Sequence, residues 1–252
     1  MVGQVQHYLG ERSAHLSFLV PEPLETHSGL LGLLDFLSIY AGEMGATNLL
    51  AEVKDSDHIL ETLRKSGFGI YGLETIWRLP EKISTSHENS HKNWRQMTSV
   101  DEPSVRTLYQ TLVPPLVQVS EPYTGVNIPR LIFQNKNGET TAYVESISGP
   151  DGIYLKPVIH PSVEKADELL AWLIELFQGI GKPVYLQMRS YQAWLTSPLE
   201  NLGASTTVHF ALMVRHLAVN QFATANIRRL SLENRQAETT TPIIQKMNEP
   251  HP

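Results

Sequence analysis

The stretch that decides the fold is "LETLRKSGFG", residues 60–69. Two basic residues precede Gly67, where they favour the negative end of a helix dipole, and the glycine suits the left-handed position that ends many helices. A similar stretch, "LENLGAS", follows at residues 199–205. The sequence numbers of the two glycines, Gly67 and Gly203, differ by 136 (203 minus 67), which is the size of a domain and too long for a solenoid repeat.

Length and composition limit the classes of protein that the chain can belong to. Its 252 residues, 41% of them hydrophobic, can build one large core or two ordinary ones. A net charge of −6 argues against binding to nucleic acid or to an anionic membrane surface. The absence of cysteine excludes disulfides, a thiolate nucleophile and cysteine-bound zinc.

The chain shows no signal for a membrane or for export. No apolar run approaches the roughly 18 residues of a membrane span, and "MVGQVQHYLGERS" lacks the basic and apolar parts of a signal peptide. A soluble, cytoplasmic protein is therefore expected. The sequence makes no prediction about the oligomeric state.

Hydrophobic patterning predicts six elements in residues 1–80, in the order strand, strand, helix, strand, helix, strand. They are a hairpin with strands near 2–9 and 13–20 around Gly10, a helix within 28–46, a strand at 48–53, a helix at 55–68 that opens on Asp55 or Ser56, and a strand at 69–79. Apolar side chains fall on one face of the first helix, and Gly45 is expected to end it. They are Leu30, Leu33, Leu34, Leu37 and Met44.

Residues 81–93 are almost free of apolar side chains and are expected to link this region to a second one at 94–218. The second region reads as strand, helix, three strands, helix, strand, helical stretch and strand. Its predicted elements are a strand at 93–99, a helix at 102–116, a hairpin at 130–147 around Asn137-Gly138, strands at 152–160 and 183–188, helices at 162–181 and 190–203, and a strand at 206–217. Residues 219–252 are a polar tail, expected to be helical at first and then disordered.

From its third strand onward the second region repeats the element order of the first. A shift of 136 in the numbering superimposes nine identical residues, at element ends and on core faces. The pairs are Leu19/Leu155, Pro21/Pro157, Leu33/Leu169, Leu34/Leu170, Leu37/Leu173, Gly45/Gly181, Leu50/Leu186, Leu63/Leu199 and Gly67/Gly203. Before the first helix a shift of 138 also fits, since it pairs Val20 with Val158. We interpret the chain as a duplicated domain whose first copy lacks its opening strand and helix. The alternative is one α/β fold with coincidental matches.

These features resemble the C-terminal half of the GNAT acyltransferase family. The resemblance rests on "LVPEPLETHSGLLGLLDFL" and "NLLAEVKDSDHILETLRKSGF" in the first copy, and on "PVIHPSVEKADELLAWL" with "LENLGA" in the second. It implies an α/β fold with a mixed sheet of the acyl-CoA N-acyltransferase type, as a partial copy at 1–80 and a complete one at 94–218. The implied activity is transfer of an acetyl group from acetyl-CoA to the amine of a small molecule or peptide.

Members of that family bind acetyl-CoA in a gap between the fourth and fifth strands. Backbone N–H groups of an Arg/Gln-x-x-Gly-x-Gly/Ala loop at the next helix N-terminus hold the pyrophosphate, because unpaired amides and the helix dipole favour an anion. In the first copy the resemblance implies a cofactor site at the end of the strand and the start of the helix. Its residues are Leu19, Val20, Thr26, His27, Ser28, Gly29 and Gly32. In the second copy the corresponding turn has no glycine and carries Glu164, Asp167 and Glu168, which would repel a diphosphate, so the loop is interpreted as lost.

The catalytic residues are not assigned by the sequence. The family often uses a tyrosine four residues before the glycine of "GF" as the acid that protonates the leaving thiolate. That position holds Leu63 in the first copy and Leu199 in the second, so Tyr71, Tyr185 or Tyr191 would have to substitute. Glu52 is a candidate base, although a glutamate at a strand edge is more often simply solvated.

Two further features of the sequence bear on function. His87 and His91 have the spacing of a helical metal pair, but no third ligand lies near them and no metal site is predicted. Loss of the loop glycines and of the acid tyrosine would also fit a catalytically degenerate GNAT-like binding or scaffolding module. Residues 226–236, "NIRRLSLENRQ", could form a partner-binding helix in that tail.

Overall fold

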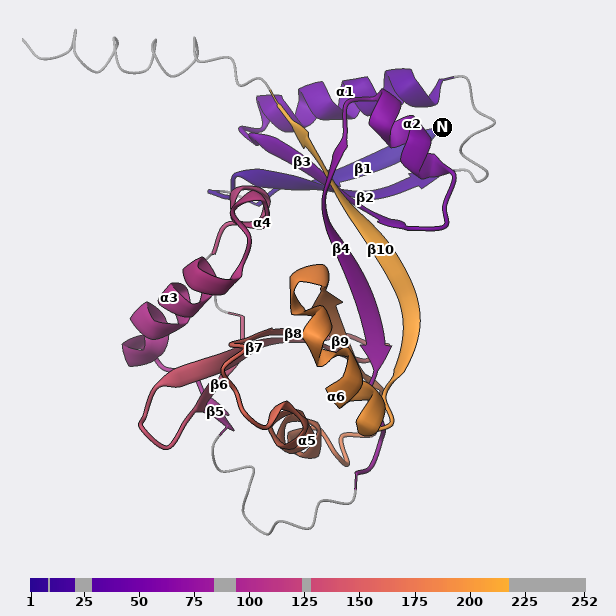
Figure 1. Ribbon diagram of the computed structural model, residues 1–252. Helices are drawn as coiled ribbons and strands as arrows, with labels where there is room; N and C mark the ends of the chain where they lie inside the picture. Colours follow the sequence, from indigo (N-terminus) through magenta and orange to yellow (C-terminus); the bar gives the residue numbers. More distant parts are fainter. Residues whose placement is uncertain (9, 21–28, 84–93, 124–127, 218–252) are drawn as a thin grey trace, which may run out of the picture. The chain divides into compact units, whose positions relative to one another are not determined.

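The computed structural model describes residues 1–8, 10–20, 29–83, 94–123 and 128–217. Residues 1–217 form one compact unit, built on a mixed sheet of ten strands (Figure 1). The strands are β1 Val2–Gln6, β2 Ser13–Val20, β3 Asn48–Lys54, β4 Gly69–Arg78, β5 Trp94–Gln96, β6 Arg130–Gln134, β7 Thr140–Ser148, β8 Ile153–Ile159, β9 Val184–Arg189 and β10 Ser205–His216. Their order in the sheet is β1-β2-β3-β10-β4-β9-β8-β7-β6-β5.

Helices connect these strands. They are α1 Leu30–Glu43, α2 Ile59–Lys65, α3 Glu102–Leu112, α4 Pro115–Ser120, α5 Ala166–Leu176 and α6 Thr196–Asn201, with 3₁₀ turns η3 Ser99–Asp101 and η4 Ser190–Leu195. Within the described residues, no helix has the length and apolar character needed to cross a membrane. Residues 219–252 and most of the predicted linker lie outside the described residues, as do His87 and His91.

The sheet repeats one arrangement in two halves. We call β1 to β4 with α1 and α2 the first half, and β5 to β10 with α3 to α6 the second half. In the first half β1 pairs antiparallel with β2, and β2 pairs parallel with β3. In the second half β7 pairs antiparallel with β8, and β8 pairs parallel with β9. The helices follow the same order, with α1 and α2 matching α5 and α6.

The halves exchange their last strands. β10, from the second half, lies between β3 and β4 of the first half, and β4 lies between β10 and β9 (Figure 1). Both long strands therefore pair with the penultimate strand of the other half and with each other. As a result the two halves share one continuous sheet, and neither completes its own sheet alone.

The stretch at residues 60–69 ends a helix as its sequence predicts. Gly67 and its counterpart Gly203 have φ angles of 85° and 79°, in the left-handed region that favours glycine. Leu63 and Leu199 are almost fully buried, at 1% and 0% exposure. The backbone conformation and the buried leucine are therefore the same at both helix ends.

Three predicted boundaries are wrong. The second helix starts at Ile59 instead of Asp55 or Ser56, because the Asp57 carboxylate accepts a hydrogen bond from the Ile59 N–H at 3.0 Å and keeps the preceding residues in a turn. The strand expected at 93–99 is only Trp94–Gln96. The helix expected at 102–116 ends at Leu112, and a second short helix, α4, begins at Pro115, since proline fits the first turn of a helix.

The predicted register of the repeat is also wrong before the first helix. Leu50 and Leu186, which match at the shift of 136, pair with His15 and Leu155 in the neighbouring parallel strand. The strands β2 and β8 are therefore offset in numbering by 140 (155 minus 15), not by 136 or 138. The first half has four more residues between this strand and its helix, so Leu19 does not match Leu155.

Three apolar clusters hold the helices to the sheet. α1 packs on one face of the first half, against Leu49 and Ala51 of β3. α5 packs on the second half, against Leu155 and Leu186. The third cluster joins α3 and α4 to Leu50 and residues of β7, β8 and β10, so these helices cover the opposite face and contact both halves.

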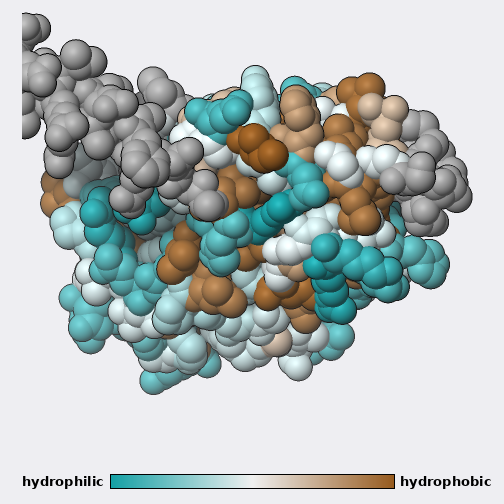
Figure 2. All heavy atoms as spheres, turned by 90° about the horizontal axis from the view of Figure 1, so that it is seen from above, coloured by the Kyte–Doolittle hydropathy of each residue, from teal (hydrophilic) through white to brown (hydrophobic). Residues whose placement is uncertain are grey.

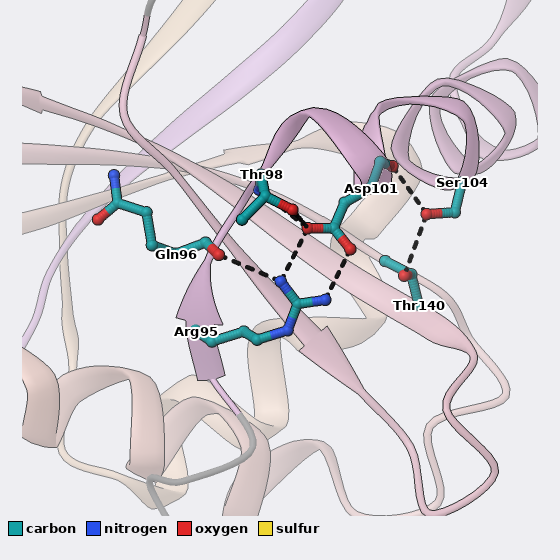
Figure 3. A network of polar contacts seen from close by, with 6 residues as sticks. All are labelled: Arg95, Gln96, Thr98, Asp101, Ser104 and Thr140. Carbon is teal, nitrogen blue, oxygen red and sulfur yellow. Dashed lines mark hydrogen bonds and ion pairs between the residues drawn. The ribbon is translucent and has the colours of Figure 1, made fainter.

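A polar network fixes the start of α3 (Figure 3). Asp101 accepts hydrogen bonds from Arg95 Nη1 at 2.8 Å and from Arg95 Nη2 at 2.6 Å. The same carboxylate accepts bonds from the Thr98 N–H and hydroxyl, which completes a capping box. The Arg95 guanidinium and the Thr98 donors hold the pKa of Asp101 well below its usual range.

The surface over α1 is apolar. Figure 2 shows apolar side chains gathered on the face that α1 and α2 form in Figure 1. The exposed apolar residues of α1 are Leu31, Phe36, Ile39 and Tyr40, and the rings of Phe36 and Tyr40 stack at 6.4 Å.

Candidate functional site

The parallel strand pair in each half separates partway along its length. β2 and β3 are paired through three residues each and separate after His15 and Leu50. β8 and β9 separate in the same way after Leu155 and Leu186. Each half therefore has a gap between two parallel strands, followed by a helix N-terminus. This is the position in which the resemblance implies acetyl-CoA.

The gap of the second half is closed by a side chain. Gln192 in η4 is 2% exposed, and its amide bridges the free edge of β8. In the amide orientation that satisfies both neighbours, the amide nitrogen donates to the carbonyl oxygen of Pro157 at 2.8 Å, and the amide oxygen accepts from the Ile159 N–H at 3.1 Å. These two backbone groups of β8 therefore already have partners and are not available to a ligand.

Within the described residues, which exclude 21–28, the gap of the first half has no matching plug. The position matching Gln192 is Ser56 (192 minus 136), which is short and exposed. Among the described residues, no side-chain hydrogen bond joins residues 16–20 to residues 51–54. In the described part of the chain the two gaps therefore differ at one matched residue, and Gln192 fills the second gap.

The helix starts that follow the gaps differ too. α1 has Gly29 as its N-cap, no side-chain cap and no acidic residue in its first turn. A Cβ added at Gly29 or Gly32 would meet no atom within 4 Å, so neither glycine is required by packing. Gly42, at the far end of α1, shares this property, and the case for Gly29 and Gly32 rests on their position. α5 instead carries Asp167 and Glu168 in its first turn.

The predicted cofactor residues lie around this first gap where they are described. Leu19 packs beneath α1 at the end of β2, and Val20 is 44% exposed. Gly29 and Gly32 lie at the start of α1. The remaining three residues, Thr26, His27 and Ser28, lie outside the described residues.

A polar cavity of about 260 Å³ lies on the sheet face opposite α1 and α5. Its lining includes His15 and Leu50, at the point where β2 and β3 separate. It also includes Lys156 and Gln187, at the point where β8 and β9 separate. Residues of α3, α4 and the segment after them complete its lining. The cavity therefore extends along one face of the sheet, from the point where β2 and β3 separate to the point where β8 and β9 separate.

A buried arginine organises one side of this cavity. Arg189 Nε lies 2.8 Å from Glu74 Oε2, and Arg189 Nη2 lies 2.9 Å from Glu121 Oε2. Tyr71 donates a hydrogen bond from its hydroxyl to Glu121 Oε1. The side chains of Glu74 and Arg189 are only 1% and 14% exposed, so one guanidinium joins β4, β9 and the end of α4 in a region from which water is largely excluded.

Burial changes the acidity of this network. Desolvation raises the pKa of Glu74 to about 7, although Arg189 opposes the shift. Burial also raises the pKa of Glu121, but Arg189 and the Tyr71 hydroxyl more than offset it, so the pKa of Glu121 is lowered. The Tyr71 hydroxyl is a hydrogen-bond donor near neutral pH, because burial raises the pKa of Tyr71 far above its ordinary value.

A second ion pair reaches the same lining through Glu145. Arg130 Nη2 is 2.8 Å from Glu145 Oε1, and the Arg130 guanidinium sits 4.9 Å above the centre of the Tyr123 ring. The described residues hold no group of three or more histidine, aspartate or glutamate side chains placed to bind a metal.

The predicted catalytic candidates do not all lie at the cavity. Leu63 is in the core, so its position supplies no proton donor. Tyr191 lines the cavity, Tyr71 is bonded to Glu121, and Tyr185 stacks on Tyr154 at 5.1 Å, outside the cavity lining. Glu52 is exposed on β3 and does not line the cavity.

Sequence reasoning missed the residues that shape the site. Gln192, Arg189, Glu121 and Lys156 occur in no motif, and each is defined by what lies next to it after folding. The available signal was positional, because Arg189 ends the strand that matches β3, and Gln192 follows it before the repeated helix end.

Comparison with known proteins identifies the fold. No family model matches the chain, and no curated protein matches it. Solved structures do match. A conserved protein of unknown function from Staphylococcus epidermidis has a TM-score of 0.57 at 12% identity, over 82% of this chain and 85% of that one.

Acetyltransferases are among the matching structures. A GCN5-related N-acetyltransferase from Sphaerobacter thermophilus has a TM-score of 0.55 at 12% identity, over 85% of this chain and 76% of that one. One from Kribbella flavida has a TM-score of 0.54 at 12% identity, over 84% and 83%. The chain therefore has the acyl-CoA N-acyltransferase-like fold of GNAT proteins, as the sequence predicted.

Proposed function

We propose that the chain is an acyl-CoA-dependent N-acyltransferase that binds acyl-CoA in the first half only. The observation that carries this proposal is the contrast between the two gaps among the described residues, in which Gln192 fills the second and the matched residue of the first is the short, exposed Ser56. The start of α1 fits a pyrophosphate, since its N–H groups have no side-chain cap and no acidic neighbour in the first turn. Gly29 and Gly32 leave room for a ligand to approach the backbone.

We infer further that β1 to β4 with α1 and α2, and β7 to β10 with α5 and α6, derive from one duplicated unit. Matching strand order, matching helix ends at Gly67 and Gly203, and the reciprocal exchange of β4 and β10 support this origin. After duplication, one half kept its ligand gap and the other closed it. The second half then forms one side of the site that binds the acceptor.

The amine acceptor would reach the thioester from the cavity. Its ammonium loses a proton, the free nitrogen attacks the thioester carbonyl carbon, and the C–S bond breaks to release a thiolate that takes up a proton. His15 is the side chain best placed to accept the first proton, because it is the last paired residue of β2 and also lines the cavity.

Titration calorimetry with acetyl-CoA tests the proposal. We expect one binding site per chain, abolished by Gly29→Glu, because a carboxylate at the helix start repels the pyrophosphate. Gly42→Glu is the matched control, since it places the same charge at the other end of α1, where a Cβ also meets nothing within 4 Å. Absence of heat at high micromolar acetyl-CoA, with folding intact, would refute the proposal.

A catalytically degenerate binding or scaffolding module is the second candidate. The observation in its favour is that Leu63 and Leu199, at the position of the family's acid tyrosine, are both core residues. That candidate predicts a folded protein that binds a ligand in the cavity and does not bind acetyl-CoA.

A further inference from the structure

The carboxylates that line the cavity interior already have cationic partners. Glu121 is paired with Arg189 at 2.9 Å, and Glu145 is paired with Arg130 at 2.8 Å. At the rim, Glu11 and Arg12 carry opposite charges on neighbouring residues. The acidic side chains of the lining therefore leave little negative charge uncompensated.

Two cationic groups on the same lining have donors without a hydrogen-bond partner among the described residues. Lys156 lines the cavity from β8, and its charge acts to lower the pKa of Glu74 and of Glu121, but none of the ion pairs or side-chain hydrogen bonds among the described residues involves it. Arg189 Nη1 is buried and also has no hydrogen-bond partner in the described part of the chain. Lys156 lies on the same face of β8 as Val158, and Arg189 lies on the same face of β9 as Gln187.

A buried polar acceptor accompanies these donors. Gln187 Oε1 is buried without a hydrogen-bond partner among the described residues, and Gln187 lines the cavity between Lys156 and Arg189. Buried polar atoms without partners are rare in folded proteins, so a group of them beside a cavity indicates that something else supplies the missing bonds. The missing partner of the two cations must offer acceptor oxygens.

We propose that the amine acceptor also carries a carboxylate, which Lys156 and Arg189 bind at the second-half end of the cavity. The inference rests on the proposed acyl transfer for the role of the amine. Lys156 and Gln187 follow directly after the last paired residues of β8 and β9, whereas His15 and Leu50 mark the corresponding point of β2 and β3. The carboxylate would thus bind beside the gap of the second half, between β8 and β9. The amine would extend toward the gap of the first half, between β2 and β3.

The cavity volume restricts the acceptor to a small molecule. About 260 Å³ is at or below the lower end of the range for drug-sized ligand pockets, which begins at roughly 300 Å³. A free amino acid or an ω-amino acid fits this chemistry, and a folded protein surface does not. The second half, with its filled gap, would then supply a rigid, charged side of the acceptor site.

Calorimetry with matched probes tests the inference without acyl-CoA. The probes are unbranched amino acids from glycine to 6-aminohexanoate, each compared with its carboxamide, which keeps the amine and the length but removes the negative charge. We expect at least one acid to bind about tenfold more tightly than its amide, since a charge-assisted hydrogen bond is lost. Lys156→Gln should remove this preference, and Lys136→Gln, at the exposed β6–β7 turn, should keep it.

Each other outcome counts against the inference. Equal affinity for acid and amide, or a preference that survives Lys156→Gln, would show that the carboxylate is not read at this position. Binding of no probe at all would also overturn it. Because acetyl-CoA is absent from these titrations and is tested separately at Gly29, failure here leaves acyl transfer standing, and failure of acetyl-CoA binding leaves a carboxylate site without that reaction.

Discussion

Arg189 on β9 and Glu74 on β4 are directly opposite each other in the sheet, with Arg189 Nε 2.8 Å from Glu74 Oε2. β4 belongs to the first half and β9 to the second, so this ion pair crosses the exchange that joins them. Glu121 extends it to the end of α4. The charge network therefore ties the cavity lining to the strands that the halves share.

The first prediction concerns the pH dependence of stability. The folded-state pKa of Glu74 is about 7, above its ordinary value of 4.5, so the folded protein keeps a proton that the unfolded chain releases between those values. This group's contribution to stability is complete below about pH 4.5 and is lost as pH rises to about 7. Glu74→Gln should remove a pH-dependent loss of at most ~3.5 kcal/mol, since one pKa unit is about 1.4 kcal/mol.

Urea denaturation at several pH values between 5 and 8 measures this difference. Glu43→Gln, an exposed residue of α1, is the control and should follow the wild type. Parallel curves for wild type and Glu74→Gln across this range would contradict the prediction, because histidine titration is common to both proteins and cancels.

The second prediction concerns the plug in the second gap. Gln192→Ala leaves the Pro157 carbonyl and the Ile159 N–H buried without partners, and each such group costs about 1–3 kcal/mol. We expect the free energy of unfolding to fall by about 2–4 kcal/mol, measured in urea at pH 7. Gln110→Ala, on the exposed side of α3, should change it by less than about 0.5 kcal/mol. A loss for Gln192→Ala as small as that of the control would show that the bridge does not hold β8.

The third prediction concerns the network at the start of α3. Asp101→Ala removes both bonds from Arg95 and the capping bonds from Thr98, so the free energy of unfolding should fall by about 1–2 kcal/mol at pH 7. Because the folded-state pKa of Asp101 is lowered, its contribution is present above pH 4 and is lost in acid. The measurement is thermal unfolding at pH 7, and Asp151→Ala, in an exposed turn, is the control. Equal melting temperatures for the two variants would contradict this role.

How far the sequence predicts this molecule depends on the range of the interactions involved. Hydrophobic period and turn residues act locally, so they identify the strands and the helix ends at Gly67 and Gly203. The strand exchange is set by pairing between β10 and strands far earlier in the chain, and no local pattern encodes it. The pairing of His15 with Leu50 likewise depends on a loop that is four residues longer in the first half, which the shift of 136 conceals.

The candidate site was predictable only in part, for a related reason. Gly29 and Gly32 are visible in sequence because glycine at a helix start is unusual and has a physical use. Gln192 looks like an ordinary polar residue, and its role appears only when the carbonyl of Pro157 lies within 2.8 Å of its amide. The Arg189 network unites three segments that are distant in sequence, so its members become neighbours only in the folded chain.

The last prediction concerns proton transfer. If His15 accepts the proton of the attacking amine, His15→Gln keeps a polar side chain of similar size but removes the base. We expect kcat to fall about 100-fold, within the range of general base catalysis, while the Kd for acetyl-CoA changes less than threefold. His209→Gln is a matched control, because His209 lies on an exposed stretch of β10 and contacts Thr75 outside the cavity. Equal losses of kcat in the two variants, or a fall in acetyl-CoA affinity that accounts for the loss in His15→Gln, would assign proton transfer to another group.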